Sequence, residues 1–195
     1  MAVLTIRAAP RYEGTMRIAV TGTHRVGKST LIEELGERLP DHRLIDEPYA
    51  LLEEEGYEFV SPPSLEDFLE QLRRSTELLL DEERANSNVL FDRCPLDFLG
   101  YLLAHEDADA FDLEDWLPRA RSATQTLDLI VFVPIDEAAR IKLPTHEDLF
   151  QREQVNEKLA WMTLDDPFDL GVEVLTVQGR RTERVAQVLR RIARS

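Results

Sequence analysis

The hydrophobic positions of the chain fall into five short runs that alternate with longer amphipathic stretches. The runs are Arg17 to Val20, Arg43 to Ile45, Asn88 to Phe91, Leu129 to Val133 and Val172 to Val177. Four of the five are rich in β-branched or aromatic residues and lack strict alternation, which is typical of strands covered on both faces. They predict the strands of a buried sheet.

The stretches between these runs have the spacing of helices. In the clearest one, apolar residues recur from Leu65 to Leu80, after Pro62 and Pro63 and with Ser64 placed to cap the first turn. The other predicted helices are 28–39, 95–104, 113–123, 147–163 and 181–193, and the acidic stretch 106–112 is predicted to be a solvated loop. Strands separated by helices predict an α/β fold with parallel pairing through right-handed crossovers.

A phosphate-binding motif follows the first predicted strand. The residues Gly22-Thr23-His24-Arg25-Val26-Gly27-Lys28-Ser29 match the P-loop pattern G-x-x-x-x-G-K-[ST], and the helical run from Thr30 comes next. The glycines let the backbone curl so that its amides point at phosphate oxygens, and the helix N-terminus adds a positive dipole. We expect Lys28 to contact the β- and γ-phosphates and the Ser29 hydroxyl to be a ligand of Mg²⁺. A glycine turn that merely precedes a helix is the alternative.

Two other predicted strands end in acidic residues. In open α/β sheets the ligand lies at the carboxyl ends of the strands. Asp92, beside Arg93, follows the third strand and is a candidate Mg²⁺ ligand. Glu47 follows the second strand and is a candidate to accept the proton of an acceptor hydroxyl. The alternatives are that Asp92 caps a turn and pairs with Arg93, and that Glu47 is an ordinary loop acid before a proline.

Basic residues also follow the predicted strands, and we expect them to converge on one rim as an electropositive pocket for polyphosphate. They are Arg25, Lys28, Arg93, Arg140, Lys142, Arg180 and Arg181. The region 136–152 is predicted to be a closing lid, in which Arg140 or Arg152 stabilises charge on the transferred group. A solvated helix face explains either arginine as well. Gln71 and Arg74 lie where an acceptor could bind, although a surface role is favoured.

Composition narrows the choice of partners. The chain has 195 residues and a formal net charge of -15, which disfavours nucleic acid and anionic membranes and favours small anions. The single cysteine, Cys94, excludes an internal disulfide and multi-cysteine zinc sites and suits a cytoplasmic protein. No run approaches the ~20 apolar residues of a membrane span. We expect an N-terminal extension over 1–15 and a single domain over 16–195.

These features resemble the P-loop kinases that phosphorylate nucleosides and nucleotides, particularly the branch similar to the nicotinamide-riboside kinase domain. The resemblance rests on GTHRVGKST at 22–30, DEP at 46–48, FDRCPLDFLGYL at 91–102, the lid region, and VQGRRTER at 177–184. It implies ATP as donor, the sheet order 2-3-1-4-5, Glu47 as base or acceptor ligand, and a turn at Gly179-Arg180 near the adenine. Many such kinases carry two closely spaced lid arginines, whereas this chain has Arg140-Ile141-Lys142 and a distant Arg152.

The sequence therefore predicts an ATP- and Mg²⁺-dependent kinase that acts on a small nucleoside-like molecule. A stand-alone NTPase without an acceptor is one alternative, and a GTP-dependent switch is another. Asp97 to Gly100 spells D-x-x-G but falls at a helix start, and the chain has no N-K-x-D guanine motif. The identity of the acceptor and a possible homodimer stay open.

Overall fold

A five-stranded parallel sheet forms the centre of the computed structural model, which describes residues 15–81, 87–136 and 149–194. The strands are β1 (Arg17–Thr21), β2 (Arg43–Ile45), β3 (Val89–Asp92), β4 (Leu129–Phe132) and β5 (Glu173–Thr176). Their order is β2-β3-β1-β4-β5 and every pairing is parallel. The predicted α/β class and sheet order are confirmed.

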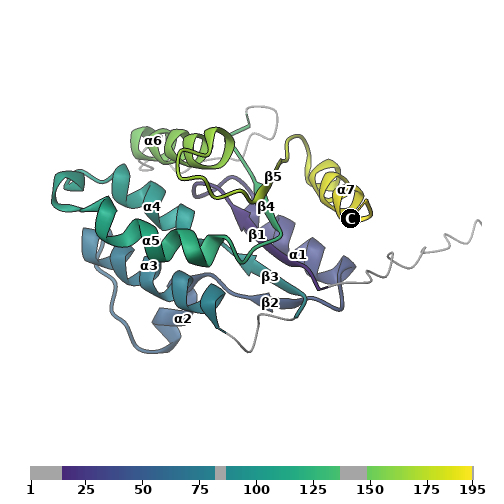
Figure 1. Ribbon diagram of the computed structural model, residues 1–195, viewed down its shortest axis with the longest axis horizontal. Coiled ribbons are helices and arrows are strands. Elements are labelled where there is room, and N and C mark those ends of the chain that lie inside the picture. Colours follow the sequence, from purple (N-terminus) through teal and green to yellow (C-terminus); the bar gives the residue numbers. More distant parts are fainter. Residues whose placement is uncertain (1–14, 82–86, 137–148, 195) are drawn as a thin grey trace, which may run out of the picture.

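Helices cover both faces of this sheet (Figure 1). Alternate residues of β1 face opposite sides, so Ile18 and Val20 belong to one core cluster and Ala19 to the other. The Ile18 side is covered by α1 (Lys28–Arg38) and α7 (Arg181–Ile192). The Ala19 side is covered by α3 (Leu65–Leu80), α4 (Pro95–Leu103), α5 (Leu113–Thr124) and α6 (Leu149–Ala160). Burial on both faces explains why the strands read as continuous apolar runs.

Three local elements differ from the sequence-based expectation. A short helix, α2 (Pro48–Glu54), follows β2 where no helix was predicted, because its seven residues are too few to show a helical period. A 3-10 turn (Ala108–Ala110) interrupts the predicted acidic loop. The helix α6 ends in a π-helical turn (Trp161–Asp165), so the predicted helix 147–163 changes its hydrogen bonding at Trp161.

Some predictions fall on residues outside the described ranges. The N-terminal extension 1–15 lies outside them except for Thr15. Most of the lid region 136–152 lies outside them too, including Arg140 and Lys142. In the described part of the chain, no helix combines the length and the apolar character that crossing a membrane requires.

The strand order brings three turns together at one edge of the sheet. β1 lies between β3 and β4, and Val20 stands in register with Asp92. The backbone amide of Arg93 donates to the carbonyl of Val20 at 3.0 Å, which joins the turn after β3 to the end of β1. Since β2 pairs with β3 on the other side, the residues that follow β1, β3 and β2 converge there.

Candidate functional site

The phosphate loop lies between β1 and α1 and depends on two glycines. A Cβ atom at Gly22 would stand 2.4 Å from the carbonyl oxygen of Val133, so only glycine fits against the residue that follows β4. Gly27 has φ +91° and caps α1 in the left-handed conformation. The first amides of a helix have no acceptor inside the helix, so those at Lys28, Ser29 and Thr30 remain available to an anion.

Positively charged side chains hold the outward carbonyls of this loop. The carbonyls of Gly22, Thr23, His24, Arg25 and Val26 all accept hydrogen bonds from such side chains. We call these side chains the cation clamp; its members are Lys28, Arg93, Arg152 and Arg184. These bonds hold the carbonyls of the loop in place, so the carbonyls are not free to turn toward an anion at the helix start.

Two members of the cation clamp are Lys28, the first residue of α1, and Arg93, in the turn after β3. Lys28 Nζ donates to the carbonyl of Thr23 at 2.8 Å, and Arg93 Nη1 donates to the carbonyl of Gly22 at 3.2 Å. Lys28 is 6% exposed, so its ammonium group is held inside the site. This places two positive charges beside the loop of a protein whose formal net charge is -15.

The other two members come from helices far along the chain. Arg152 of α6 donates through Nε to the carbonyl of His24 at 3.2 Å and through Nη2 to that of Arg25 at 3.4 Å. Arg184 of α7 donates through Nη1 to the carbonyl of Val26 at 2.6 Å. Arg152 was predicted to act on the transferred phosphoryl group as a lid residue. In this structure its guanidinium contacts the backbone of the loop.

The turn expected to lie near the adenine is joined to the phosphate loop. Arg184 Nε donates to the carbonyl of Gly179 at 2.9 Å, and the amide of Gly179 donates to Asp136 Oδ2 at 2.7 Å. Arg184 and Asp136 are also 3.5 Å apart as an ion pair. One buried guanidinium therefore connects the Gly179 turn, the start of the lid region and the phosphate loop. Arg180 is exposed and caps α7.

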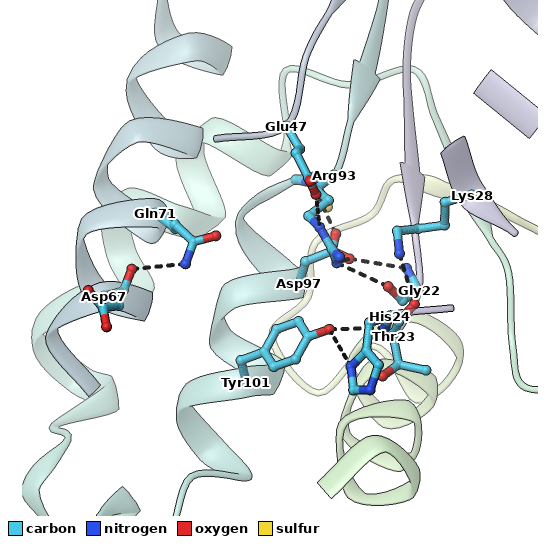
Figure 2. Close-up of polar contacts among 11 residues, drawn as sticks. Gly22, Thr23, His24, Lys28, Glu47, Asp67, Gln71, Arg93, Asp97 and Tyr101 are labelled. Atoms are coloured by element: carbon cyan, nitrogen blue, oxygen red, sulfur yellow. Dashed lines mark hydrogen bonds and ion pairs between the residues drawn. The ribbon is translucent and has the colours of Figure 1, made fainter. Parts of the chain in front are cut away.

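On the other side of the loop, an acid-arginine-acid chain crosses the site (Figure 2). Arg93 Nε donates to Glu47 Oε2 at 2.9 Å, and Arg93 Nη1 donates to Asp97 Oδ1 at 3.0 Å. Asp97 is fully buried, whereas the side chain of Glu47 is 36% exposed. The predicted base is thus in direct contact with the predicted arginine and has a solvent-accessible face on which an acceptor hydroxyl could bind.

Asp92 has the properties of a Mg²⁺ ligand. Its Oδ1 atom is buried and has no hydrogen-bond partner among the described residues. Burial raises the pKa of this carboxyl to about 6, against the charges of Arg93 and Lys28, which lower it. A bound cation would satisfy the oxygen and return the carboxyl to its charged form. Ser29 is exposed at the start of α1. One carboxylate and one hydroxyl suit Mg²⁺, which keeps waters and phosphate oxygens as its other ligands.

Burial also shifts the titration of Lys28. Desolvation lowers the pKa of its ammonium to about 7, helped by the charge of Arg93 and opposed by Asp97, Asp92 and Glu47. A lysine with this pKa is partly neutral at physiological pH. Binding a polyanion favours the charged form, so above the pKa the nucleotide must bind together with a proton.

We therefore expect the affinity for a Mg²⁺-bound ATP analogue to fall by up to about tenfold per pH unit above pH 7. Calorimetric titrations between pH 7 and 9, in buffers of different ionisation enthalpy, measure both the affinity and the proton uptake. Lys28→Arg is the matched control, because a guanidinium does not titrate in this range. An affinity of the unmodified protein that does not change up to pH 9 would contradict the role of Lys28.

The predicted basic rim is formed only in part. Arg25 is exposed, although its carbonyl accepts from Arg152. Arg181 is half exposed and forms an ion pair with Glu34 on α1. Arg140 and Lys142 lie outside the described residues. Among the described arginines, those that reach the loop are Arg93, Arg152 and Arg184.

Sequence reasoning did not assign a role to two buried side chains of the site. Arg184 shares the buried face of α7 with Val188 and Ile192, so a charge in the register of apolar residues was the available signal. Tyr101 of α4 accepts from the amide of His24 at 3.0 Å through its hydroxyl; it lies within the segment 91–102 that carries the family resemblance, but the resemblance gave it no role. Gln71, for which a surface role was favoured, is 6% exposed because α3 packs against α4.

Comparisons with known proteins agree with this architecture. The model of a family described as AAA domain matches residues 17–184. No curated protein matches the sequence significantly. Deoxyadenosine kinase from M. mycoides with bound dATP superimposes with a TM-score of 0.62 and 17% identity, covering 91% of this chain and 100% of that chain.

Two thymidylate kinases have similar structures. The enzyme from Candida albicans gives a TM-score of 0.60 at 18% identity and covers 93% of this chain and 92% of its own. The enzyme from Ehrlichia chaffeensis gives 0.59 at 15% identity and covers 92% of this chain and 99% of its own. At these identities the likeness establishes a shared fold.

Proposed function

The chain belongs to the AAA domain family, and we propose that it is a kinase that transfers the γ-phosphoryl group of Mg²⁺-bound ATP to a hydroxyl group of a small nucleoside-like molecule. One observation carries this proposal: Glu47 lies beside the phosphate loop, joined to it through Arg93. A nucleotide-binding loop needs no such carboxylate to hold phosphate. A partly exposed acid at this position is suited to accept the proton of an attacking hydroxyl.

The residues of the loop would bind and orient the donor. The amides at the start of α1 and the ammonium of Lys28 would hold the phosphate oxygens, and the turn at Gly179-Arg180 would lie beside the base. Ser29 and Asp92 would hold Mg²⁺, which neutralises charge on the β- and γ-phosphate oxygens during transfer. Arg152 would stabilise the transferred group indirectly, by fixing the carbonyls of His24 and Arg25. Arg140 remains a second candidate for direct contact with that group.

The charges around Glu47 favour an acceptor without a phosphate group. Among the described residues, the cation that pairs with Glu47 is Arg93, which is shared between Glu47 and Asp97. Arg74 of α3 forms an ion pair with Glu55. A phosphorylated acceptor carries two negative charges and would need a cation that is not already neutralised. The deoxyadenosine kinase and the thymidylate kinases named above illustrate the two possibilities, and the charge pattern supports the nucleoside type for this chain.

We expect Glu47→Gln to reduce acceptor-stimulated ADP formation by about 10²- to 10⁴-fold, the usual contribution of a general base. ADP formation should be measured with Mg·ATP and a panel of nucleosides and nucleoside monophosphates. Glu34→Gln is the matched control, because Glu34 of α1 also pairs with an arginine, but with Arg181 of α7 rather than with Arg93.

The outcomes of this assay separate the alternatives. If no acceptor accelerates ADP formation and Glu47→Gln behaves as the unmodified protein, the kinase proposal is wrong. ADP formation at the same rate without any acceptor would favour a stand-alone NTPase. A clear preference for GTP over ATP would favour a switch protein, although Asp97 and Gly100 both lie inside α4 rather than at a strand end.

A further inference from the structure

The helix α4 contacts the phosphate loop through two side chains that lie one turn apart. Asp97 Oδ1 accepts a hydrogen bond from the amide of Gly22 at 3.1 Å. The Tyr101 hydroxyl accepts one from the amide of His24 at 3.0 Å. Residues four apart on a helix share a face, so α4 presents both acceptors to the loop together (Figure 2).

Asp97 also fixes the arginine that leads to Glu47. The same Oδ1 atom accepts from Arg93 Nη1 at 3.0 Å, and Oδ2 accepts from the amide of Cys94 at 3.0 Å. One fully buried carboxylate therefore serves the loop, the turn after β3 and the start of α4. Arg93 has φ +75°, which is unfavourable for a residue with a side chain, so the conformation of this turn depends on the contacts that hold it.

The two amides that donate to α4, those of Gly22 and His24, belong to the first half of the loop. The amides at the start of α1, in the second half, have no acceptor within the helix and are the ones suited to phosphate. We propose that Asp97 and Tyr101 are positioning residues, which hold the first half of the loop against α4 so that the second half is open to the triphosphate. Through Arg93, Asp97 also sets the place of Glu47 relative to the loop.

Asp67 serves as a control that distinguishes the positioning role of Asp97 from its role as a helix cap. Asp67 of α3 accepts from the amide of Ser64 at 2.8 Å through Oδ2, as Asp97 does from that of Cys94. Both carboxylates are third in their helices and both are buried. The other oxygen of Asp67 accepts from the Tyr57 hydroxyl at 3.2 Å instead of from the loop. Asp67→Asn therefore weakens a helix cap and a contact with Tyr57, neither of which belongs to the loop.

The test is the affinity for Mg²⁺ with a non-hydrolysable ATP analogue, measured by calorimetry without any acceptor. Asparagine keeps the volume of Asp97 but has one acceptor oxygen. It therefore cannot accept both from the amide of Gly22 and from the amide of Cys94, which bond to different oxygens of the carboxylate. We expect Asp97→Asn to weaken binding by at least about tenfold, as for a lost charge-assisted hydrogen bond. Asp67→Asn should bind as the unmodified protein does. Both variants should melt at lower temperature.

Tyr101→Phe keeps the ring and removes the hydroxyl, and we expect it to weaken binding by about three- to tenfold. It also tests the proposal if Asp97→Asn does not fold. Unchanged affinity in folded Asp97→Asn, or in Tyr101→Phe, would overturn the positioning role. The inference rests on the proposed nucleotide binding by the loop: if the unmodified protein does not bind the analogue, that function fails, whatever the variants do.

Discussion

Replacing Lys28 by methionine is expected to reduce turnover by about 10³-fold, the effect of removing a preorganised charge from a phosphoryl-transfer site. Lys28 is buried and its Nζ atom already lies against the loop, at 2.8 Å from the carbonyl of Thr23. The amine therefore lies at the phosphate site before the nucleotide arrives, and binding of the phosphates favours its charged form. Without it, the developing charge on the β- and γ-phosphate oxygens loses its main protein-borne cation.

The same change should leave the nucleotide-free protein folded. Burial lowers the pKa of Lys28, which means that its charged form is unfavourable there without a bound anion. Methionine fills a similar volume, so we expect the free energy of unfolding to change by no more than about 1.5 kcal/mol. The thermal shift produced by Mg·ATP, measured beside ADP formation, should disappear.

Lys158→Met is the control, because Lys158 lies in the last turn of α6 and makes no contact with the loop among the described residues. It should keep both the thermal shift and the turnover. Undiminished stabilisation of a folded Lys28→Met variant by Mg·ATP would refute nucleotide binding by this loop, and with it the proposed kinase.

Replacing Arg93 by methionine is expected to destabilise the protein by roughly 3 to 5 kcal/mol, because it leaves a buried carboxylate without its counter-charge. Asp97 is fully buried and Arg93 is the cation it pairs with. The carbonyl of Gly22 also loses a donor. Arg93 is thus required both for the fold at this turn and for the position of Glu47.

Denaturant titration gives the free energy of unfolding, and for a chain of this size the melting temperature should fall by on the order of 10 °C. Arg74→Met is the matched control, since Arg74 also pairs with a glutamate but at the surface, where such a pair contributes about 1 kcal/mol or less. If both variants lose the same free energy of unfolding, the buried pair contributes no more to stability than the surface pair. Arg93→Lys should recover little of the lost free energy of unfolding. An ammonium group cannot donate to both Glu47 and Asp97 in the geometry of a guanidinium.

The elements whose structure is determined by residues close together in the sequence could be predicted from it. Strands buried on both faces read as apolar runs, and the capped helix from Leu65 follows from a local hydrogen-bonding pattern. The phosphate loop could be identified because glycine spacing, the lysine and the flanking strand and helix are all contiguous in the chain. Short or irregular elements such as α2 lack enough residues to show a period.

The tertiary structure decided which charged residues belong to the site. Arg152 bonds to a carbonyl 128 residues away and Arg184 to one 158 residues away, and no local pattern encodes such pairs. Asp97 looked like an ordinary helix-start acid until the order β2-β3-β1 put α4 against the loop. Charge along the chain identifies candidates, but the energy of a buried charge depends on the partners and the desolvation that packing creates, which only the folded chain determines.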